Sequence, residues 1–187
     1  CDWSSDVCSS DLYAVCRATL PGGRSETATA TLPLADPAMG GHASFALGLA
    51  MALPQRKIVL FDSDGDVQMS MGALATIAEQ KPANLYHFML DNECYATTGG
   101  QPVPNASRVH YDQLALGAGY GEAHSFDNLE TFSINVERIL AKPGPVFVAL
   151  KIKPEIINVP IGSRRKWNAR SAAQCIIDMK KEIGIAV

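Results

Sequence analysis

The sequence lacks any apolar run close to the roughly eighteen residues that a membrane-spanning helix requires. It also lacks, at its start, a charged stretch followed by an apolar core, which is the pattern of a secretory signal peptide. The composition, 47% hydrophobic and 19% charged, is ordinary for a globular protein and excludes a fibre or a disordered chain. We therefore expect a cytoplasmic protein with no membrane partner.

The first twelve residues, CDWSSDVCSSDL, read like the translation of a common sequencing-library adapter. We treat residues 1–12 as an artefact and leave them out of the fold prediction. Residues 13–38 show no clear periodicity and form an uncertain lead-in. Residues 39–187 are long enough to bury a core, and neither a repeat nor a linker divides them, so one domain is predicted.

Long basic stretches are missing as well. The 16 Lys and Arg residues face 19 Asp and Glu residues, and the one tight basic cluster, Arg164 to Lys166, is more typical of a solvated turn. Outside the adapter-like start, Cys16, Cys94 and Cys175 are an odd number without metal-ligand spacing. The sequence therefore predicts no nucleic-acid partner, no zinc site and no disulfide framework.

From about residue 42 the sequence alternates helical patterns with short apolar or β-branched runs, which is typical of parallel βαβ units. Helices are predicted at 42–53, 67–80, 111–117, 129–140 and 171–183, and strands at 57–62, 85–91, 123–126 and 146–152. In the second helix, Met69, Leu74 and Ile77 are expected to face inward. The predicted fold class is α/β, a parallel sheet with helices on both faces.

Two polar residues follow neighbouring predicted strands. Asp64 comes just after the strand KIVLFD, and Asn92 comes just after LYHFMLD. Ligands in open α/β sheets gather at the carboxyl ends of strands, and a helix N-terminus there attracts phosphate. An Asp carboxylate, an Asn amide oxygen, a backbone carbonyl and two phosphate oxygens together suit Mg²⁺. The pattern indicates a site for a diphosphate and Mg²⁺ at this edge of the sheet.

Asp64-Gly65, the 28-residue step from Asp64 to Asn92, and Tyr95 shortly after resemble the thiamine-diphosphate motif usually written GDG followed by NN. The resemblance implies the diphosphate-binding domain of that enzyme family, with thiamine diphosphate and Mg²⁺ as cofactors. It implies the Asp64 carboxylate, the Asn92 side chain and the Cys94 carbonyl as metal ligands. Gly65 and Tyr95 are implied as further cofactor-binding residues.

The same resemblance covers roughly residues 38–154 and assigns more residues to the cofactor. Met39 stands where the family places a bulky apolar residue beneath the cofactor, which forces its bent conformation. The Pro37 carbonyl and the Met39 N–H are implied to bond the aminopyrimidine. Thr97 and Thr98 could offer donors to the diphosphate, although a Thr-Thr-Gly-Gly run also makes a plain loop.

Three positions depart from the motif. Ser63 replaces its first Gly and Asp91 replaces its first Asn, and both are mild changes. Asp66 stands where a Ser or another small residue often meets phosphate. Its carboxylate would repel a diphosphate unless it points to solvent or into the N-terminus of its own helix, where an acid is favourable by roughly 0.3–1 kcal/mol. Ser63 and Asp66 are nevertheless counted among the expected cofactor-binding residues.

Three segments, HASFALGLAMALP, MGALATIAEQ and NLYHFMLDNECYATTGGQP, are most similar to the sulfopyruvate and phosphonopyruvate decarboxylase group. The substrates of that group are 2-oxo acids with a terminal anion, so the resemblance implies a thiamine-diphosphate-dependent decarboxylase. The group shows His directly after its Met-Gly pair, whereas Gly41 precedes His42 here. The stretch LPLADPA before Met39 also differs, because the group is often Gly-rich there.

No catalytic side chain is expected in this chain. The family activates the cofactor with a Glu from a separate pyrimidine-binding domain across a subunit interface, and no segment here resembles that domain. We therefore expect either a partner subunit or a missing N-terminal half, and a dimer or tetramer in the complete enzyme. Cys94 is not expected to act as a nucleophile, because the cofactor supplies one.

Plainer interpretations exist for each residue. Asp64 would also cap a helix, Asn92 would also suit a turn after a strand, and Met39 would also suit a core. The four histidines are expected to be structural. His87 lies within a predicted strand. The other three lie near the ends of predicted elements and have no obvious carboxylate partner: His42, His110 and His124. Of these, His42 is the best placed for contact with the pocket.

Two alternative enzyme functions stay open, an acetolactate-synthase-like carboligase and a 2-oxo acid oxidoreductase β chain. An alternative of another class is a non-catalytic phosphate- or nucleotide-binding module on a flavodoxin-like sheet, because a fold does not fix a function. Binding of thiamine diphosphate and the identity of the product separate these alternatives.

Overall fold

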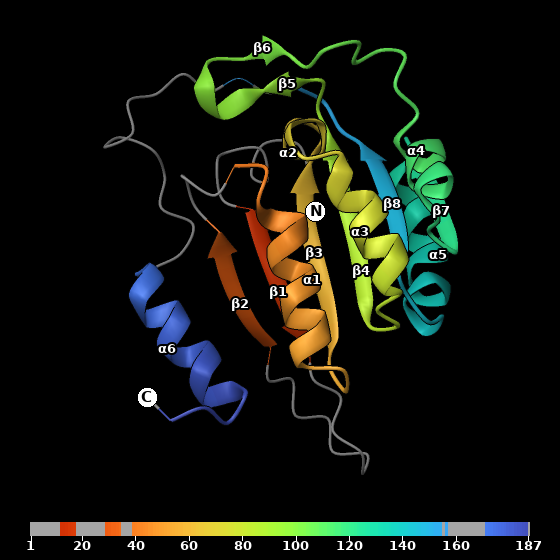
Figure 1. Cartoon of the computed structure of the whole chain (residues 1–187). Coiled ribbons are helices and arrows are strands. Elements are labelled where there is room, and N and C mark those ends of the chain that lie inside the picture. The colour runs from red at the N-terminus through yellow and green to blue at the C-terminus, as the bar shows by residue number, and fades with distance from the viewer. Residues whose placement is uncertain (1–11, 18–28, 35–38, 155, 157–170, 187) are drawn as a thin grey trace.

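The computed structural model describes residues 12–17, 29–34, 39–154, 156 and 171–186. They form a six-stranded sheet in the order β2-β1-β3-β4-β8-β7 (Figure 1). Its strands are β1 (Leu12–Arg17), β2 (Thr29–Leu34), β3 (Lys57–Ser63), β4 (Leu85–Asp91), β7 (Glu122–Phe126) and β8 (Val146–Lys151). The helices are α1 (His42–Ala52), α2 (Asp64–Met69), α3 (Gly72–Gln80), α4 (Tyr111–Ala118), α5 (Leu129–Ala141) and α6 (Ala172–Glu182).

The strands β3, β4, β8 and β7 run parallel, which confirms the predicted α/β class with a parallel sheet. The remaining two strands add an antiparallel edge, since β1 pairs antiparallel with both β2 and β3. These two strands come from the segment in which no periodicity was found, and β1 begins at Leu12, the last residue set aside as adapter. The antiparallel edge was therefore not predicted.

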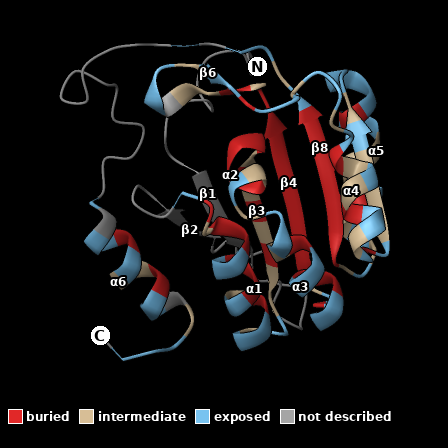
Figure 2. Ribbon diagram, turned by 45° about the horizontal axis from the view of Figure 1, so that its top comes forward, coloured by how far each residue is buried: buried red, intermediate tan, exposed pale blue. Residues whose placement is uncertain are grey.

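Side chains of the central strands alternate between two hydrophobic clusters. On one face Leu85 and Met89 pack with residues of α1, α3, α4 and α6. On the other face Phe88 packs with Phe132 and Ile139 of α5. Figure 2 shows β4 and β8 as buried strands in the middle of the sheet. Helices therefore cover both faces, as predicted.

The helix predicted at 67–80 is two helices, and this is a correction. α2 ends at Met69, and Ser70 takes a non-helical conformation with φ −136° and ψ 46° before α3 begins at Gly72. Leu74 and Ile77 in α3 are buried as expected, whereas Met69 is 48% exposed. Because the helix is interrupted at Ser70, Met69 does not share the buried face of Leu74 and Ile77.

The loop predicted after β4 contains a small hairpin. β5 (Cys94–Tyr95) pairs antiparallel with β6 (Gln101–Pro102), and the short 3-10 helix η1 (Ala96–Thr98) lies between them. Figure 1 shows this hairpin above the ends of β3 and β4. Of the helices within the described ranges, none is both long enough and apolar enough to cross a bilayer.

The parallel register brings two loops to one edge of the sheet. Ser63, the last residue of β3, is paired with Leu90 of β4. The residues that follow, Asp64 after β3 and Asn92 after β4, therefore leave the sheet side by side at the carboxyl edge. Asp91 of β4 is paired in turn with Lys151 at the end of β8.

Candidate cofactor and metal site

Asp64 joins the two loops at the carboxyl edge. Its side chain is fully buried at the first turn of α2. One carboxylate oxygen accepts a hydrogen bond from the backbone N–H of Gly65 at 3.0 Å, and the other accepts from the N–H of Glu93 at 2.8 Å. The Glu93 contact crosses from α2 to the loop after β4. A carboxylate placed in this way holds the two halves of the motif together.

The charge of Asp64 is poorly stabilised within the protein itself. Burial and the nearby negative charge of Asp91 raise the pKa of Asp64 to about 7, although backbone N–H groups of Gly65, Glu93 and Asn92 lower it. The Oδ1 atom of Asp91 is buried and lacks a hydrogen-bond partner among the described residues, whereas its Oδ2 atom pairs with Lys151. Two neighbouring buried carboxylates of this kind fit a divalent cation, which would stabilise their ionised forms.

Asn92 is 5% exposed, and its side-chain oxygen accepts a hydrogen bond from the Cys94 N–H at 3.1 Å. This contact is the turn that the plainer interpretation proposed, but an amide oxygen has two lone pairs, so accepting from an N–H is compatible with binding a metal ion. Glu93 between them has a left-handed backbone conformation with φ 64°. The chain bends sharply at Glu93, so the Asn92 side chain and the Cys94 backbone belong to one short loop.

The Cys94 thiol is buried, and burial together with the charges of Asp64 and Glu93 raises its pKa. A thiol held protonated in this way is a poor nucleophile. The expectation that Cys94 has no nucleophilic role is thus consistent with its surroundings.

Gly65 is required by the ring of Tyr95. A Cβ atom added at Gly65 would lie 2.7 Å from Cδ1 and 2.8 Å from Cε1 of Tyr95. No other residue fits there unless the ring moves. The two motif residues therefore form one packed unit, in which the hairpin strand β5 lies against the start of α2.

Asp66 is buried, at 6% exposure, so it does not point to solvent, and its carboxylate reaches back to Ser63, the N-cap residue of α2. Its Oδ1 accepts a 2.6 Å hydrogen bond from the N–H of Gly40, and its Oδ2 accepts one of 2.9 Å from the hydroxyl of Ser63. Ser63 in turn caps α2, because its Oγ accepts from the Asp66 N–H at 3.2 Å. Both side chains predicted to meet the diphosphate are thus engaged with the protein.

Three of the four histidines have carboxylate partners, and for His42 and His124 this corrects the expectation that no partner was near. His42 Nδ1 lies 3.2 Å from Asp66 and 3.6 Å from Asp62, His87 Nε2 lies 3.1 Å from Asp62, and His124 Nε2 lies 2.6 Å from Glu122. Strand and helix patterns place each residue on its own element but do not show which elements are adjacent. The partners of His42 and His87 were missed for that reason.

The buried pairs shift the protonation of their members. Burial alone lowers the pKa of His42, but hydrogen bonds and charge from Asp62 and Asp66 raise it to about 10. For Asp62 the directions are reversed: burial alone raises its pKa, but the contacts with His42 and His87 outweigh burial and lower that pKa. The raised pKa favours the imidazolium form of His42 beside the two carboxylates.

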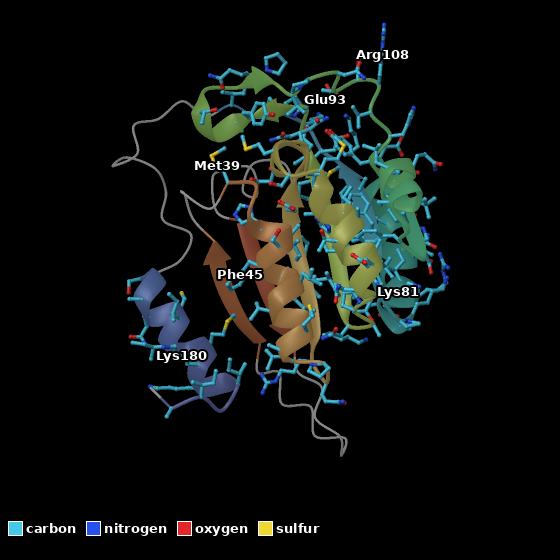
Figure 3. The ribbon with its side chains drawn as sticks, in the orientation of Figure 1. Met39, Phe45, Lys81, Glu93, Arg108 and Lys180 are labelled. Carbon is cyan, nitrogen blue, oxygen red and sulfur yellow. The ribbon has the colours of Figure 1, made fainter. Side chains whose placement is uncertain are left out.

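The remaining predicted residues are less fully described. Met39 is 36% exposed and lies at the same end of the molecule as Glu93 (Figure 3). The Thr98 hydroxyl is exposed and hydrogen-bonds within the hairpin, 2.9 Å from Oε1 of Gln101. Pro37 and the side chain of Thr97 lie outside the described residues. Their expected contacts with the cofactor stay predictions.

Sequence reasoning missed one charged residue at the edge, Lys151. Its ammonium group lies 3.0 Å from Asp91 and 2.5 Å from Glu93. Burial lowers the pKa of Lys151, but the hydrogen bonds that Lys151 donates to Glu93 and Asp91 outweigh burial and raise that pKa. Lys151 thus balances the carboxylate that replaces the motif's first Asn. The sequence signal that could have found Lys151 is its position at the end of the last predicted strand, which pairs with the strand that carries Asp91.

Comparison with known proteins decides the family of this site. The family model described as "Thiamine pyrophosphate enzyme, C-terminal TPP binding domain" matches residues 29–150. The chain belongs to this family. The match includes Asp64, Asn92 and Tyr95, so the predicted resemblance is confirmed.

Two relatives share 39% identity with the chain. The sulfopyruvate decarboxylase subunit beta of Methanothermobacter thermautotrophicus aligns over 66% of this chain and 63% of its own length. The phosphonopyruvate decarboxylase of Streptomyces viridochromogenes aligns over 63% of this chain and 29% of its own length. The chain thus spans less than two thirds of these relatives.

A crystal structure of transketolase from Campylobacter jejuni superposes with a TM-score of 0.52 at 21% identity. It covers 64% of this chain and 20% of the transketolase chain. At this identity the likeness concerns the fold alone, and it agrees with a thiamine-pyrophosphate-binding α/β fold.

Proposed function

We propose that this chain is the thiamine-diphosphate- and Mg²⁺-binding half of a decarboxylase for 2-oxo acids that carry a terminal anion. One observation carries the proposal. The chain belongs to a thiamine-pyrophosphate enzyme family, and its buried Asp64 carboxylate joins the first turn of α2 to the Asn92 loop at the carboxyl edge of the sheet. The substrate class follows from the two decarboxylases that share 39% identity with the chain.

The metal ligands in this proposal are the Asp64 carboxylate, the Asn92 amide oxygen and the Cys94 carbonyl. All are hard oxygen donors of the kind that Mg²⁺ prefers, and phosphate oxygens with water would complete the shell. The raised pKa of Asp64 and the unpartnered Oδ1 of Asp91 support a cation at this place, because the Asp64 charge is buried beside a second carboxylate and Oδ1 of Asp91 stays without a partner in the described part of the chain while Lys151 pairs with Oδ2. Mg²⁺ would then join the diphosphate to the protein.

When bound, thiamine diphosphate supplies the nucleophile that attacks a 2-oxo carbon and the electron sink that allows CO₂ to leave. The residues of this chain hold and orient that group. Asp64 and Asn92 fix the metal end, the Tyr95 ring braces the loop against Gly65, and Met39 provides an apolar surface. This division leaves the activating carboxylate to a pyrimidine-binding domain or subunit, which we propose as the partner in a dimer or tetramer.

Product analysis tests the reaction class. The chain, assembled with its pyrimidine-binding partner and supplied with thiamine diphosphate and Mg²⁺, is incubated with sulfopyruvate, phosphonopyruvate or pyruvate. A decarboxylase releases CO₂ and an aldehyde, fastest from one of the two anionic substrates. A carboligation product from two pyruvates would support the acetolactate-synthase-like alternative, and an acyl-CoA formed with an electron acceptor would support the oxidoreductase.

A binding comparison tests the alternative of another class. Calorimetric titration with thiamine diphosphate, ATP and NAD, each with Mg²⁺, is expected to give saturable binding for thiamine diphosphate alone. Binding of a nucleotide without binding of thiamine diphosphate would overturn the proposed function in favour of a nucleotide-binding module.

A further inference from the structure

The turn ahead of α1 is held against α2. The Gly40 N–H donates a buried 2.6 Å hydrogen bond to Asp66, which lies in the first half of α2. At the other end of that helix, a Cβ atom added at Gly40 would lie 3.0 Å from both the Met69 Cβ and the Ser70 Oγ. Gly40 also has φ +76°, a conformation that other residues rarely adopt. The turn therefore contacts α2 at both ends.

The Asp66 carboxylate that makes this contact is directed by buried neighbours. His42, the first residue of α1, places Nδ1 3.2 Å from Asp66 Oδ2. The Ser63 hydroxyl donates to the same oxygen at 2.9 Å. Asp62 lies 3.6 Å from the same nitrogen of His42 and is held in turn by His87 at 3.1 Å. The charge of Asp66 is thus matched by His42 within the protein, so the position typical of a phosphate contact faces the protein here.

We propose that Asp66 is a positioning residue that sets the distance between the two ends of the cofactor site. α2 carries Asp64 at the diphosphate end, and the turn that Asp66 holds carries Met39, the residue expected beneath the thiamine rings. The hydrogen bond from Gly40 makes the turn and α2 one unit. This inference rests on the proposed function and adds a role for a residue whose carboxylate is held by Gly40, Ser63 and His42 of the protein itself.

The consequence is a selective effect on ligands. Inorganic diphosphate with Mg²⁺ occupies only the metal end, which depends on Asp64 and Asn92. Thiamine diphosphate with Mg²⁺ also needs the turn, and a turn that is released from α2 must be ordered at the moment of binding. Loss of the Asp66 contact should therefore weaken thiamine diphosphate far more than inorganic diphosphate.

The test is calorimetric titration of the complete protein, this chain with its pyrimidine-binding partner, with each of the two ligands in the presence of Mg²⁺. For Asp66→Ala we expect thiamine diphosphate to bind at least about tenfold more weakly and inorganic diphosphate to change by less than about twofold. Asp66→Asn keeps an oxygen that can accept from Gly40, so it should restore most of the affinity for thiamine diphosphate. Asn84→Ala, which removes contacts at the opposite end of α1, serves as the matched control and should change neither affinity.

Gly40→Ala perturbs the same contact from the other side and leaves every charge in place, so it carries the test if Asp66→Ala does not fold. It should show the same selective loss. Equal losses for both ligands, no loss for either, or failure of Asp66→Asn to restore binding would each overturn the positioning role. A wild-type protein that binds neither ligand would instead overturn the proposed function, and the two failures are thereby distinguished.

Discussion

The ring of Tyr95 lies so close over Gly65 that a Cβ atom at position 65 would come within 2.7 Å of it. Because the ring belongs to the hairpin that follows the Asn92 loop, this contact ties the two halves of the metal site together. Gly65→Ala should therefore displace Tyr95 and cost about 1–3 kcal/mol of folding free energy, the usual range for overpacking a buried position. Chemical denaturation measures the loss, and cofactor titration should show weaker binding.

Gly72→Ala is the matched control, because nothing lies within 4 Å of a Cβ atom at that position. It should leave both stability and cofactor binding close to wild type. The double variant Gly65→Ala, Tyr95→Ala should recover part of the lost stability, since it removes the ring that the new methyl group meets. If Gly65→Ala behaved like Gly72→Ala, the packing account of this glycine would be wrong.

Metal binding should release a proton from Asp64. The folded pKa of this group, about 7, is raised above the ordinary aspartate value of 3.8, so near neutral pH the protein without metal binds a proton that an unfolded chain does not. The contribution of Asp64 to stability is then fully present below pH 3.8 and is lost as the pH rises through about 7. Mg²⁺ binds the ionised form, so its affinity should rise with pH up to about 7 and then level off.

Calorimetry in two buffers with different ionisation enthalpies counts the protons. We expect close to one proton released per Mg²⁺ at about pH 6 and close to none at about pH 8. Asp64→Asn should abolish the difference between the two pH values. The same proton release at both pH values in the wild type would mean that Asp64 does not give up a proton to the metal.

Asn84 secures the end of α1 that is distant from the cofactor site. Its side-chain amide donates to the backbone carbonyls of Ala50, Leu53 and Arg56 at 3.1, 2.9 and 2.7 Å. Asn84→Ala leaves these carbonyls without that donor and should cost about 1–3 kcal/mol in a denaturant titration. Affinity for the cofactor should not change. A loss of cofactor binding in this variant would show that general stability, and not local geometry, governs the site.

The sequence alone predicted the parallel sheet and its carboxyl edge well, because β3, β4 and β8 are continuous apolar runs with helical patterns between them. Asp64 and Asn92 could be placed at the carboxyl edge, since each comes just after one of these runs and neighbouring parallel strands end at the same edge. The antiparallel pair β1 and β2 could not, because it comes from the segment without periodicity.

The contacts that shape the site were beyond sequence reasoning for a different reason. Gly40 and Asp66 are 26 residues apart, and nothing in either local pattern links them. The break between α2 and α3 was hidden because the buried Val67 of α2 and Leu74 of α3 are seven residues apart, a helical spacing that continues across it. His87 and Asp62 lie on adjacent strands, but adjacency depends on the sheet order, which only the structure supplies.

The measurement that tests the central claim most directly is the binding of thiamine diphosphate to the assembled protein with and without Mg²⁺, for wild type and Asp64→Ala. We expect Mg²⁺-dependent binding in the wild type and a large loss of affinity for thiamine diphosphate in the variant. Removing an outer-shell partner of a metal site costs roughly 10- to 100-fold in affinity, and the loss of a direct ligand should be at least as large. Glu137→Ala, which removes an exposed carboxylate on α5, should bind as the wild type does. Unchanged affinity in Asp64→Ala, or wild-type binding that is indifferent to Mg²⁺, would contradict the account of this site.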